Sequence, residues 1–381
     1  MDHRPARPLT TMNLDAKLTS PHLTPPPQTR RQVPVPQSTH RDHQATGTAQ
    51  PALGAGPERP AGYLFAHFAG EHRPDGERIR FALCDNPRMD RWTELTGIPP
   101  LAPAGGGARD PFLVRAADGS GFRLLATDLR IHGGEDWERA IAHGSRDLLV
   151  WSSADLRGWD GPHRVEVMPE QAGCVWAPEA VYDPGREEYL VFWASTVYPD
   201  DDPRHESPSY QRMYCATTKD FRTFGDSRVW VDKGYPVIDS TVVEDDGWFY
   251  RFTKDERLPG TPDAPDAKFV FVERSRDLRA TDYEPVAQGV GRGTDELPGL
   301  AHAEGPIVLP APDGRGWLLL LDEFLGRGYV PFRADRLDSS VWLPAADPEF
   351  CVLPPGLRHG SVLPLTEAEC AGLRSPASAG V

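Results

Sequence analysis

The feature that most constrains the fold is an internal repeat made of a strand, a polar turn and an aromatic residue. The copies start 57 to 68 residues apart, and each closes on Trp, Phe or Tyr. Five copies at this spacing predict five blades of four strands each, and therefore an all-β, five-bladed β-propeller. The copies are FALCDNPRMDRW (81–92), LVWSSADLRGW (149–159), YCATTKDFRTF (214–224), FVERSRDLRATDY (271–283) and PFRADRLDSSVW (331–342).

A second series of short segments interleaves with this repeat, and each segment starts an inner strand. All but the last precede a long apolar strand, and the strand that would complete the last one is 63–68, near the other end of the chain. We therefore expect the C-terminal segment to be the inner strand of the blade that 63–98 complete. Such a closed ring has no free sheet edge. The segments are RDP (109–111), WAPE (176–179), IDS (238–240), EGP (304–306) and HGS (359–361).

The first sixty residues have a different composition from the rest of the chain. They contain eleven prolines and few large apolar residues, with seven basic and four acidic side chains. Such a segment cannot bury enough apolar surface to offset the entropy lost on ordering. We expect residues 1–60 to be disordered, 61–367 to form the propeller and 368–381 to be a C-terminal tail.

Charge and cysteine usage exclude several classes of function. The net charge of −15 disfavours nucleic acid as a partner. The five cysteines are scattered, without a CxxC pair, so neither a zinc site nor a disulfide framework is expected. No apolar run approaches the ~18–20 residues of a membrane helix, and the N-terminus lacks the apolar region of a signal peptide. These features predict no membrane contact and a cytoplasmic location, with secretion as the open alternative. They do not indicate an oligomeric state.

Polar residues at the starts of the inner strands are the candidate site. The inner strands of a propeller line its central channel, so these side chains should converge on one mouth. One acidic residue beside Pro or Gly is usually a turn residue. Five polar residues in a repeated context indicate a shared site, and carboxylates that converge in a cleft suit acid–base catalysis. They are Asp110, Glu179, Asp239, Glu304 and His359.

These motifs resemble those of glycoside hydrolase family 43, whose members are five-bladed propellers. The resemblance extends from about residue 62 to 366. Further motifs resemble its arabinofuranosidase-like branch, which implies exo-acting removal of terminal pentose or furanose units, with β-xylosidase activity as a related option. The blade motifs are RDPF (109–112), WAPEAVYD (176–183), VIDS (237–240), EGPIV (304–308) and RHGSV (358–362). The branch motifs are FAGE (68–71), ATDL (126–129) and FYRFTKDE (249–256).

The resemblance implies a role for each of three carboxylates. Asp110 matches the general base that activates water, and Glu304 matches the general acid that protonates the leaving oxygen. Asp239 matches the carboxylate that orients the acid and raises its pKa, because neighbouring like charges resist joint ionisation. Inverting hydrolysis needs a base and an acid roughly 6.5–9.5 Å apart, and different blades of one channel can supply that separation.

Further residues are expected to bind the carbohydrate substrate. Trp176 is either a platform for a sugar ring or a packing residue between blades. Arg109 either binds a substrate hydroxyl or pairs with Glu179 or Asp110. The expected substrate-binding residues are Trp176, Arg109, Glu179, Arg251 and His359.

His359 and two basic residues have more than one interpretation. The resemblance implies that His359 lies near a water or a bound cation, whereas a core histidine bonded to the backbone is the alternative. Histidine is a poor ligand for calcium, so Ca²⁺ or another hard cation in the channel would be held mostly through water. No cofactor is required. Arg251 and Lys254 follow the third inner strand and could reach the pocket.

Other classes of propeller protein would have different sequence features. A retaining enzyme of the invertase and levansucrase type would need a nucleophile in a first-strand motif like WMNDPNG, which does not precede Asp110. A non-catalytic carbohydrate-binding propeller would be expected to lack one of the carboxylates. The repeats of WD and kelch propellers, with periods near ~40 and ~50 residues, are absent from the sequence.

Overall fold

The computed structural model describes residues 57, 59–134, 136–260, 262–293, 298–345 and 351–374. The predicted disorder of residues 1–60 therefore lies almost entirely outside the described residues. All five cysteines are described, and each is free and buried. In the described part of the chain, neither helix has the length or apolarity needed to cross a membrane.

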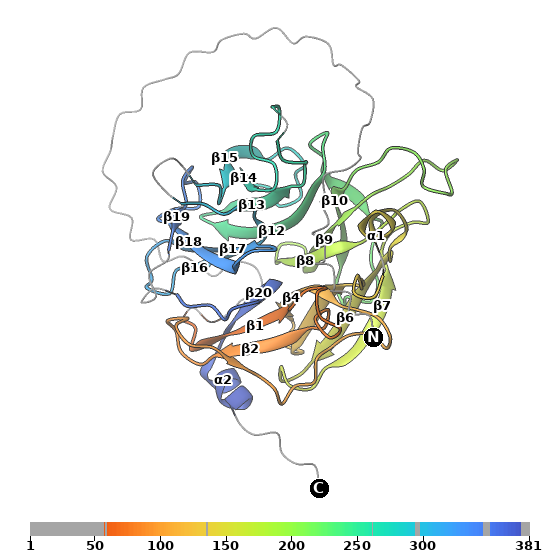
Figure 1. Ribbon diagram of the computed structural model, residues 1–381. Coiled ribbons are helices and arrows are strands. Elements are labelled where there is room, and N and C mark those ends of the chain that lie inside the picture. The colour runs from red at the N-terminus through yellow and green to blue at the C-terminus, as the bar shows by residue number, and fades with distance from the viewer. Residues whose placement is uncertain are drawn as a thin grey trace, which may run out of the picture. The chain divides into compact units, whose positions relative to one another are not determined.

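The described chain folds as a five-bladed β-propeller, which confirms the predicted fold class. Each blade is an antiparallel sheet of four strands, and the blades follow one another around a ring (Figure 1). From the innermost strand outward, they are β20 (Arg358–Leu365), β1 (Gly62–Phe68), β2 (Arg80–Cys84) and β3 (Thr93–Glu94); β4 (Arg109–Arg115), β5 (Phe122–Thr127), β6 (Asp147–Ser153) and β7 (Asp160–Glu166); β8 (Trp176–Asp183), β9 (Glu188–Ser195), β10 (Arg212–Thr218) and β11 (Arg228–Val231); β12 (Val237–Asp245), β13 (Trp248–Asp255), β14 (Val270–Ser275) and β15 (Glu284–Val290); and β16 (Glu304–Pro310), β17 (Trp317–Glu323), β18 (Gly328–Ala334) and β19 (Leu343–Pro344).

The ring closes as the interleaved segments predicted. The C-terminal strand β20 pairs antiparallel with the N-terminal strand β1, with Leu365 opposite Gly62 and Leu363 opposite Leu64. Helix α2 (Glu367–Arg374) follows, and its Cys370 and Leu373 are buried in the same core cluster as Leu64. The segment predicted as a tail therefore begins with a helix that packs on the first blade.

The repeated polar turn has a local cause in its own side chains. After β6, the Ser153 hydroxyl accepts a hydrogen bond from the backbone N–H of Leu156 at 2.9 Å. Asp155 accepts two more, from the N–H groups of Arg157 and Gly158. These bonds fix a tight turn that directs the buried Leu156 into the core. Thr218 and Asp220 make the same bonds after β10, so the Asp of the repeat is a turn residue.

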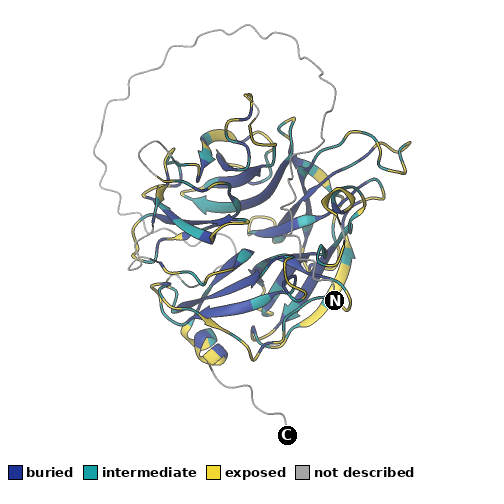
Figure 2. Ribbon diagram, viewed as in Figure 1, coloured by how far each residue is buried: buried dark blue, intermediate teal, exposed yellow. Residues whose placement is uncertain are grey.

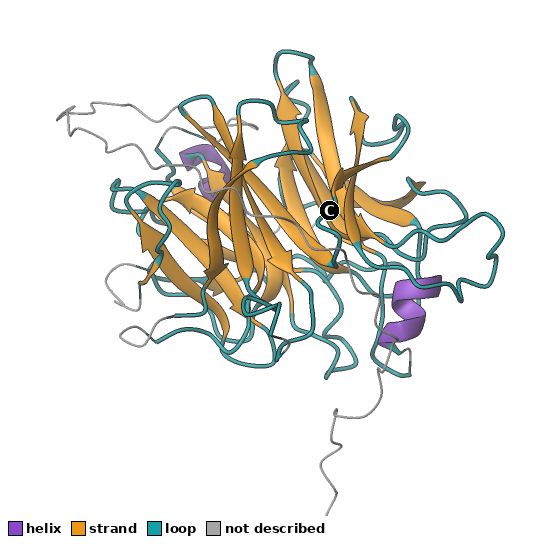
Figure 3. Cartoon of the chain, turned by 90° about the horizontal axis from the view of Figure 1, so that it is seen from above, coloured by secondary structure: helices purple, strands orange, loops and turns teal. Residues whose placement is uncertain are grey.

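Burial follows the position of a strand within its blade. The second strands β9 and β17 are buried on both faces, because the sheets of neighbouring blades pack against each other, and this explains their continuous apolar sequences. The outermost strand β7 is largely exposed (Figure 2). Strands make up nearly all of the regular structure, and the two helices are short (Figure 3).

The closing strand should contribute strongly to stability. Leu365 in β20 is fully buried, so we expect Leu365→Ala to lower the free energy of unfolding by about 2–5 kcal/mol. Leu343→Ala is the matched control, because that leucine in the edge strand β19 is 47% exposed and should cost less than about 0.5 kcal/mol. Urea denaturation measures both changes. Equal costs would contradict a closing role for β20.

Candidate active site

A β-bulge at the start of four inner strands sets the direction of the site residues. In β4, β8, β12 and β16, the pairing with the second strand shifts over the first residues. The second residue of the motif is left-handed in each: Asp110 (φ 51°), Ala177 (47°), Asp239 (53°) and Gly305 (52°). This conformation costs roughly 1–2 kcal/mol for a residue other than glycine, and such strain clusters at functional sites. The bulges therefore give Asp110 and Asp239 the same backbone conformation at the start of their strands.

The imidazole of His359 lies between two of the predicted carboxylates. Its Nδ1 is 3.5 Å from Oδ1 of Asp110 and 3.8 Å from Oδ2 of Asp239. Asp110 also accepts a 2.8 Å hydrogen bond from the Thr127 hydroxyl, and Asp239 accepts one from the backbone N–H of Gly305 at 3.4 Å. Three blades thus contribute side chains to one point, where β4, β12 and β20 begin.

Glu304 is held by two cations. Lys254 donates to Oε2 at 2.8 Å, and Arg358 donates to Oε1 at 2.7 Å. Burial by itself would raise the pKa of Glu304, but Lys254 and Arg358 together hold that pKa well below its ordinary value. The expectation that Asp239 keeps Glu304 protonated therefore does not hold in this structure, because two adjacent cations outweigh one adjacent carboxylate.

Asp239 is a carboxyl group of the site whose pKa is raised. Burial raises its pKa to about 6, although the charges of His359 and Lys254 act in the opposite direction. Only 6% of Asp239 is exposed, so little water reaches it to stabilise the charged form. Asp239 therefore loses its proton at a higher pH than Glu304, the reverse of the order that sequence reasoning assigned.

Arg358 and Asp322 are site residues that the sequence analysis did not single out. Nε of Arg358 donates to Oδ2 of the fully buried Asp322 at 2.8 Å, and the backbone N–H of His359 donates to the same oxygen at 2.9 Å. The guanidinium therefore bridges Asp322 and Glu304. Asp322 lies directly opposite Glu304 in the β16–β17 pair, and only the register reveals that proximity.

Arg109 does not pair with either predicted partner. Its guanidinium donates to Glu71 at 3.2 Å and to Glu77 at 3.0 Å instead of to Glu179 or Asp110. Glu77 also accepts two backbone N–H groups from the loop after β5. Because its charge is already shared between two carboxylates and only 6% of the residue is exposed, Arg109 supports the rim of the site.

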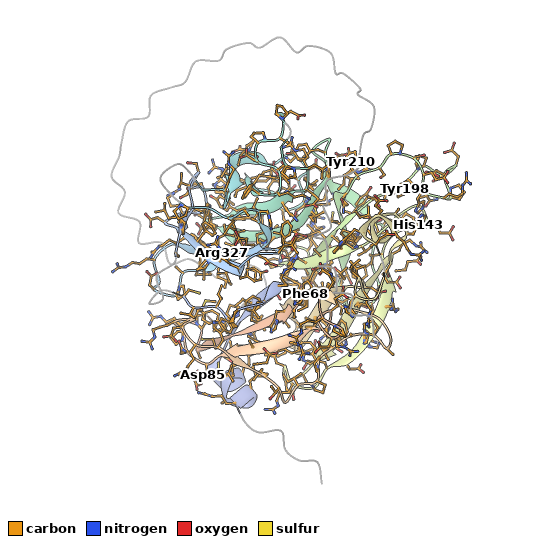
Figure 4. All side chains as sticks on the ribbon, in the orientation of Figure 1. Phe68, Asp85, His143, Tyr198, Tyr210 and Arg327 are labelled. Carbon is orange, nitrogen blue, oxygen red and sulfur yellow. The ribbon has the colours of Figure 1, made fainter. Side chains whose placement is uncertain are left out.

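Aromatic side chains surround Arg109 and extend to the surface. Its guanidinium lies 4.7 Å from the ring centre of Phe68, which is labelled near the middle of the ring of blades in Figure 4, and 5.0 Å from that of Trp137. Trp137 begins helix α1 (Trp137–His143) and is 43% exposed. It meets the predicted platform Trp176 edge-on at 6.0 Å. The two indoles could form one surface for a sugar ring, and sequence reasoning missed Trp137.

Glu179 lies further along its strand than the other carboxylates. It comes two residues after the left-handed Ala177, past the bulge, and it lines a cavity of about 710 Å³ formed by the distal halves of the inner strands. Asp110, Asp239 and Glu304 do not line that cavity. Burial raises the pKa of Glu179 well above its ordinary value, although Thr241 hydrogen-bonds to it. Its position in the strand is therefore not equivalent to those of Asp110 and Asp239, and its predicted contact with substrate stays a prediction.

Arg251 was also predicted to contact substrate, and the structure corrects this. Its side chain is fully buried and donates to Glu273 at 2.9 Å. The guanidinium lies 3.9 Å from the ring centre of Tyr283 and 4.6 Å from that of Trp230. Lys254, three residues later on the same strand, reaches Glu304.

The cation that the resemblance implies is not supported by a cluster of ligands. Among the described residues, no group of three or more His, Cys, Asp or Glu side chains is arranged to hold a metal ion. His359 has two carboxylates on one side of its ring, and a proton on Nδ1 would stabilise both. A water-held cation in the channel stays a prediction.

Comparison with known families agrees with this geometry. A family related to glycosyl hydrolase family 43, described as “Probable glycosyl hydrolase domain”, matches residues 58–371. The chain belongs to this family. The match covers every blade and all three predicted catalytic carboxylates, so the predicted class of enzyme, a glycosidase related to family 43, is confirmed at the level of the family.

Individual proteins that this chain resembles include α-L-arabinofuranosidases and an α-L-arabinanase. An α-L-arabinofuranosidase of Bifidobacterium longum is 33% identical over 261 residues, which are 62% of this chain and 24% of that protein. The chain thus spans about a quarter of that relative. An α-L-arabinofuranosidase structure from Fusarium graminearum has 15% identity and a TM-score of 0.49, covering 83% of this chain and 89% of that one. An α-L-arabinanase structure from Penicillium chrysogenum has 15% identity and a TM-score of 0.47, covering 84% and 94%.

Asp239→Asn should stabilise the fold near neutral pH. The pKa of Asp239 is raised from 3.8 to about 6, so the folded protein loses stability as pH rises from about 4 to about 6. Asparagine removes this penalty, accepts the left-handed backbone and should raise the free energy of unfolding at pH 7.5 by roughly 2–3 kcal/mol. The gain should vanish near pH 4. Urea denaturation at both pH values tests this, and a less stable variant at pH 7.5 would contradict it.

Proposed function

We propose that this domain is an inverting, exo-acting glycosidase that releases terminal α-L-arabinofuranosyl residues. The family supports the class of reaction, and the B. longum relative supports the sugar. The observation that carries the mechanism is the placement of Asp110 and Glu304. They start the inner strands of two different blades, with His359 and Asp239 between them.

Asp110 is the proposed general base. The hydroxyl of Thr127 donates to one of its oxygens, and Nδ1 of His359 lies 3.5 Å from the other, which supports a fixed orientation of the carboxylate. In the proposed step, Asp110 takes a proton from a water molecule as the water oxygen attacks the anomeric carbon. Attack from the face opposite the leaving group inverts the configuration.

Glu304 is the proposed general acid, and it must first acquire a proton. In the resting site, Lys254 and Arg358 favour its ionised form. Substrate hydroxyls that compete for these donors would weaken the hold of Lys254 and Arg358 on Glu304, and Asp239, with its pKa raised to about 6, is a neighbouring carboxyl that can supply a proton below that pH. Glu304 then gives its proton to the leaving oxygen, while the proton gained by Asp110 returns to the acid through solvent.

The stereochemistry of the product tests the reaction class. Proton NMR of a reaction with an aryl α-L-arabinofuranoside should show β-L-arabinose first, before mutarotation produces the α anomer. A first-formed α anomer would show retention and would rule out Asp110 as a base acting through water. Aryl β-D-xylosides, run in parallel, test the choice of sugar.

Leaving-group dependence distinguishes the acid from the base. Asp110→Asn and Glu304→Gln should each lower kcat/KM on phenyl arabinofuranoside by roughly 10²–10⁴-fold. The leaving group of the 2,4-dinitrophenyl substrate needs no proton. On that substrate, kcat/KM of Glu304→Gln should recover most of the way to the wild-type value, and kcat/KM of Asp110→Asn should stay low. If Asp239→Asn alone regained activity on that substrate, Asp239 would be the acid in place of Glu304.

A further inference from the structure

We infer that Tyr329 is a positioning residue for the proposed acid Glu304, and that its hydroxyl acts by holding the backbone on which Glu304 is mounted. Tyr329 lies in β18, the third strand of its blade, and its side chain reaches the start of the inner strands. The inference rests on the proposed glycosidase activity and adds a residue to the groups that support it. Tyr329 belongs to none of the motifs in the sequence that point to the site.

The hydroxyl of Tyr329 bonds to the backbone of two different inner strands. It donates to the carbonyl of Gly305 in β16 at 2.9 Å and accepts from the N–H of Gly360 in β20 at 2.9 Å. The carbonyl of Gly360 is a more distant acceptor, at 3.4 Å. Gly305 directly follows Glu304, and Gly360 directly follows His359. Each of the two short bonds is therefore one residue away from a side chain of the site.

Side chains, and not a β-ladder, connect β16 with β20. Among the described strands, ladders join only members of the same blade, and these two strands belong to different blades. Glu304, Asp322 and Tyr329 lie opposite one another on β16, β17 and β18, so they form one row across the blade. Asp322 accepts from Arg358 and from the N–H of His359. Tyr329 completes this connection one residue further along β20.

The bulge at the start of β16 depends on such bonds because its residues leave the ladder. Pairing with β17 is in place at Glu304 and resumes only at Ile307. Between them, Gly305 is left-handed, with φ of 52°. Its N–H donates to Asp239 and its carbonyl accepts from Tyr329, so side chains bind both of its backbone polar groups. Loss of the Tyr329 bond would free this peptide to rotate, and Glu304 would move with it.

Packing holds the ring of Tyr329 in place behind the bulge. The residue is 7% exposed, and its ring centre is 5.4 Å from that of Phe65. A Cβ atom on Gly305 would lie 3.0 Å from the Tyr329 oxygen, so glycine permits the close approach. Burial also raises the pKa of Tyr329 well above its ordinary value, so the hydroxyl keeps the proton that it donates.

Tyr329→Phe removes the hydroxyl and keeps the ring, and two substrates show which step it affects. On phenyl arabinofuranoside, we expect kcat to fall by roughly 10–100-fold with KM within about 3-fold, because a displaced acid protonates the leaving oxygen poorly while the sugar still binds. The 2,4-dinitrophenyl leaving group needs no proton. On that substrate, kcat should stay within about 3-fold of the wild-type value, whereas a general distortion of the site would lower kcat on both substrates alike.

Replacement of Tyr329 by p-aminophenylalanine tests the hydrogen bond itself. The amino group can donate to Gly305 as the hydroxyl does, so this variant should recover most of the kcat that Tyr329→Phe loses on phenyl arabinofuranoside. A variant no more active than Tyr329→Phe would contradict a role for the donated bond.

Tyr189→Phe is the matched control. Tyr189 is also buried, and its hydroxyl accepts a 2.7 Å hydrogen bond from the backbone N–H of Ala117 in the neighbouring blade. It lies at the end of β9 away from the catalytic mouth. Both variants should lower the midpoint of urea denaturation by a similar amount, but only Tyr329→Phe should change the ratio of kcat between the two substrates.

The response of Glu304→Gln separates failure of the inference from failure of the proposed function. No loss in Tyr329→Phe, or an equal loss on both substrates, would overturn the inference if Glu304→Gln still lost activity selectively on phenyl arabinofuranoside. The proposed function would then stand. If Glu304→Gln itself lost activity equally on both substrates, Glu304 would not be the acid, and the proposed function would fail together with the inference.

Discussion

The pairing of β20 with β1 is the contact on which the rest of the structure depends. It joins the two ends of the folded chain, buries Leu363 and Leu365 in the first blade and leaves no blade with an open inner edge. It also delivers Arg358 and His359 to the centre of the ring. The same strand therefore closes the fold and completes the site, so stability and chemistry are tied to one set of backbone hydrogen bonds.

Electrostatic competition within the closed ring sets the order in which the carboxyl groups lose their protons. Two cations hold the pKa of Glu304 well below its ordinary value, whereas Asp239 is buried with weaker compensation and its pKa is raised to about 6. Under the proposed mechanism, Glu304 must therefore gain a proton when substrate arrives. Lys254 contacts both Glu304 and Glu256. A change in the charge of either carboxylate therefore alters the electrostatic environment of the other.

The blades share one plan, but the loops at the catalytic mouth give the two sides of the site different surfaces. On the side of Asp110, the inserted helix α1 presents Trp137 next to Trp176. On the side of Glu304, Lys268 pairs with Glu256 and Arg292 pairs with Asp266, so these charged side chains are compensated. An aromatic wall suits the apolar face of a sugar ring.

The sequence by itself determined the five blades, the closure of the ring and the three carboxylates, because strand periodicity, turn chemistry and short motifs are local and repeat along the chain. The sequence could not determine which charged side chains contact one another in the folded protein. Glu304 and Asp322 face each other only through the register of β16 and β17, and Arg109 finds Glu71 and Glu77 across the site. Protonation depends on burial and on neighbours from other blades, which exist only after the ring has closed. That is why the tertiary structure, and not the motif, raises the pKa of Asp239 to about 6 and holds that of Glu304 well below its ordinary value.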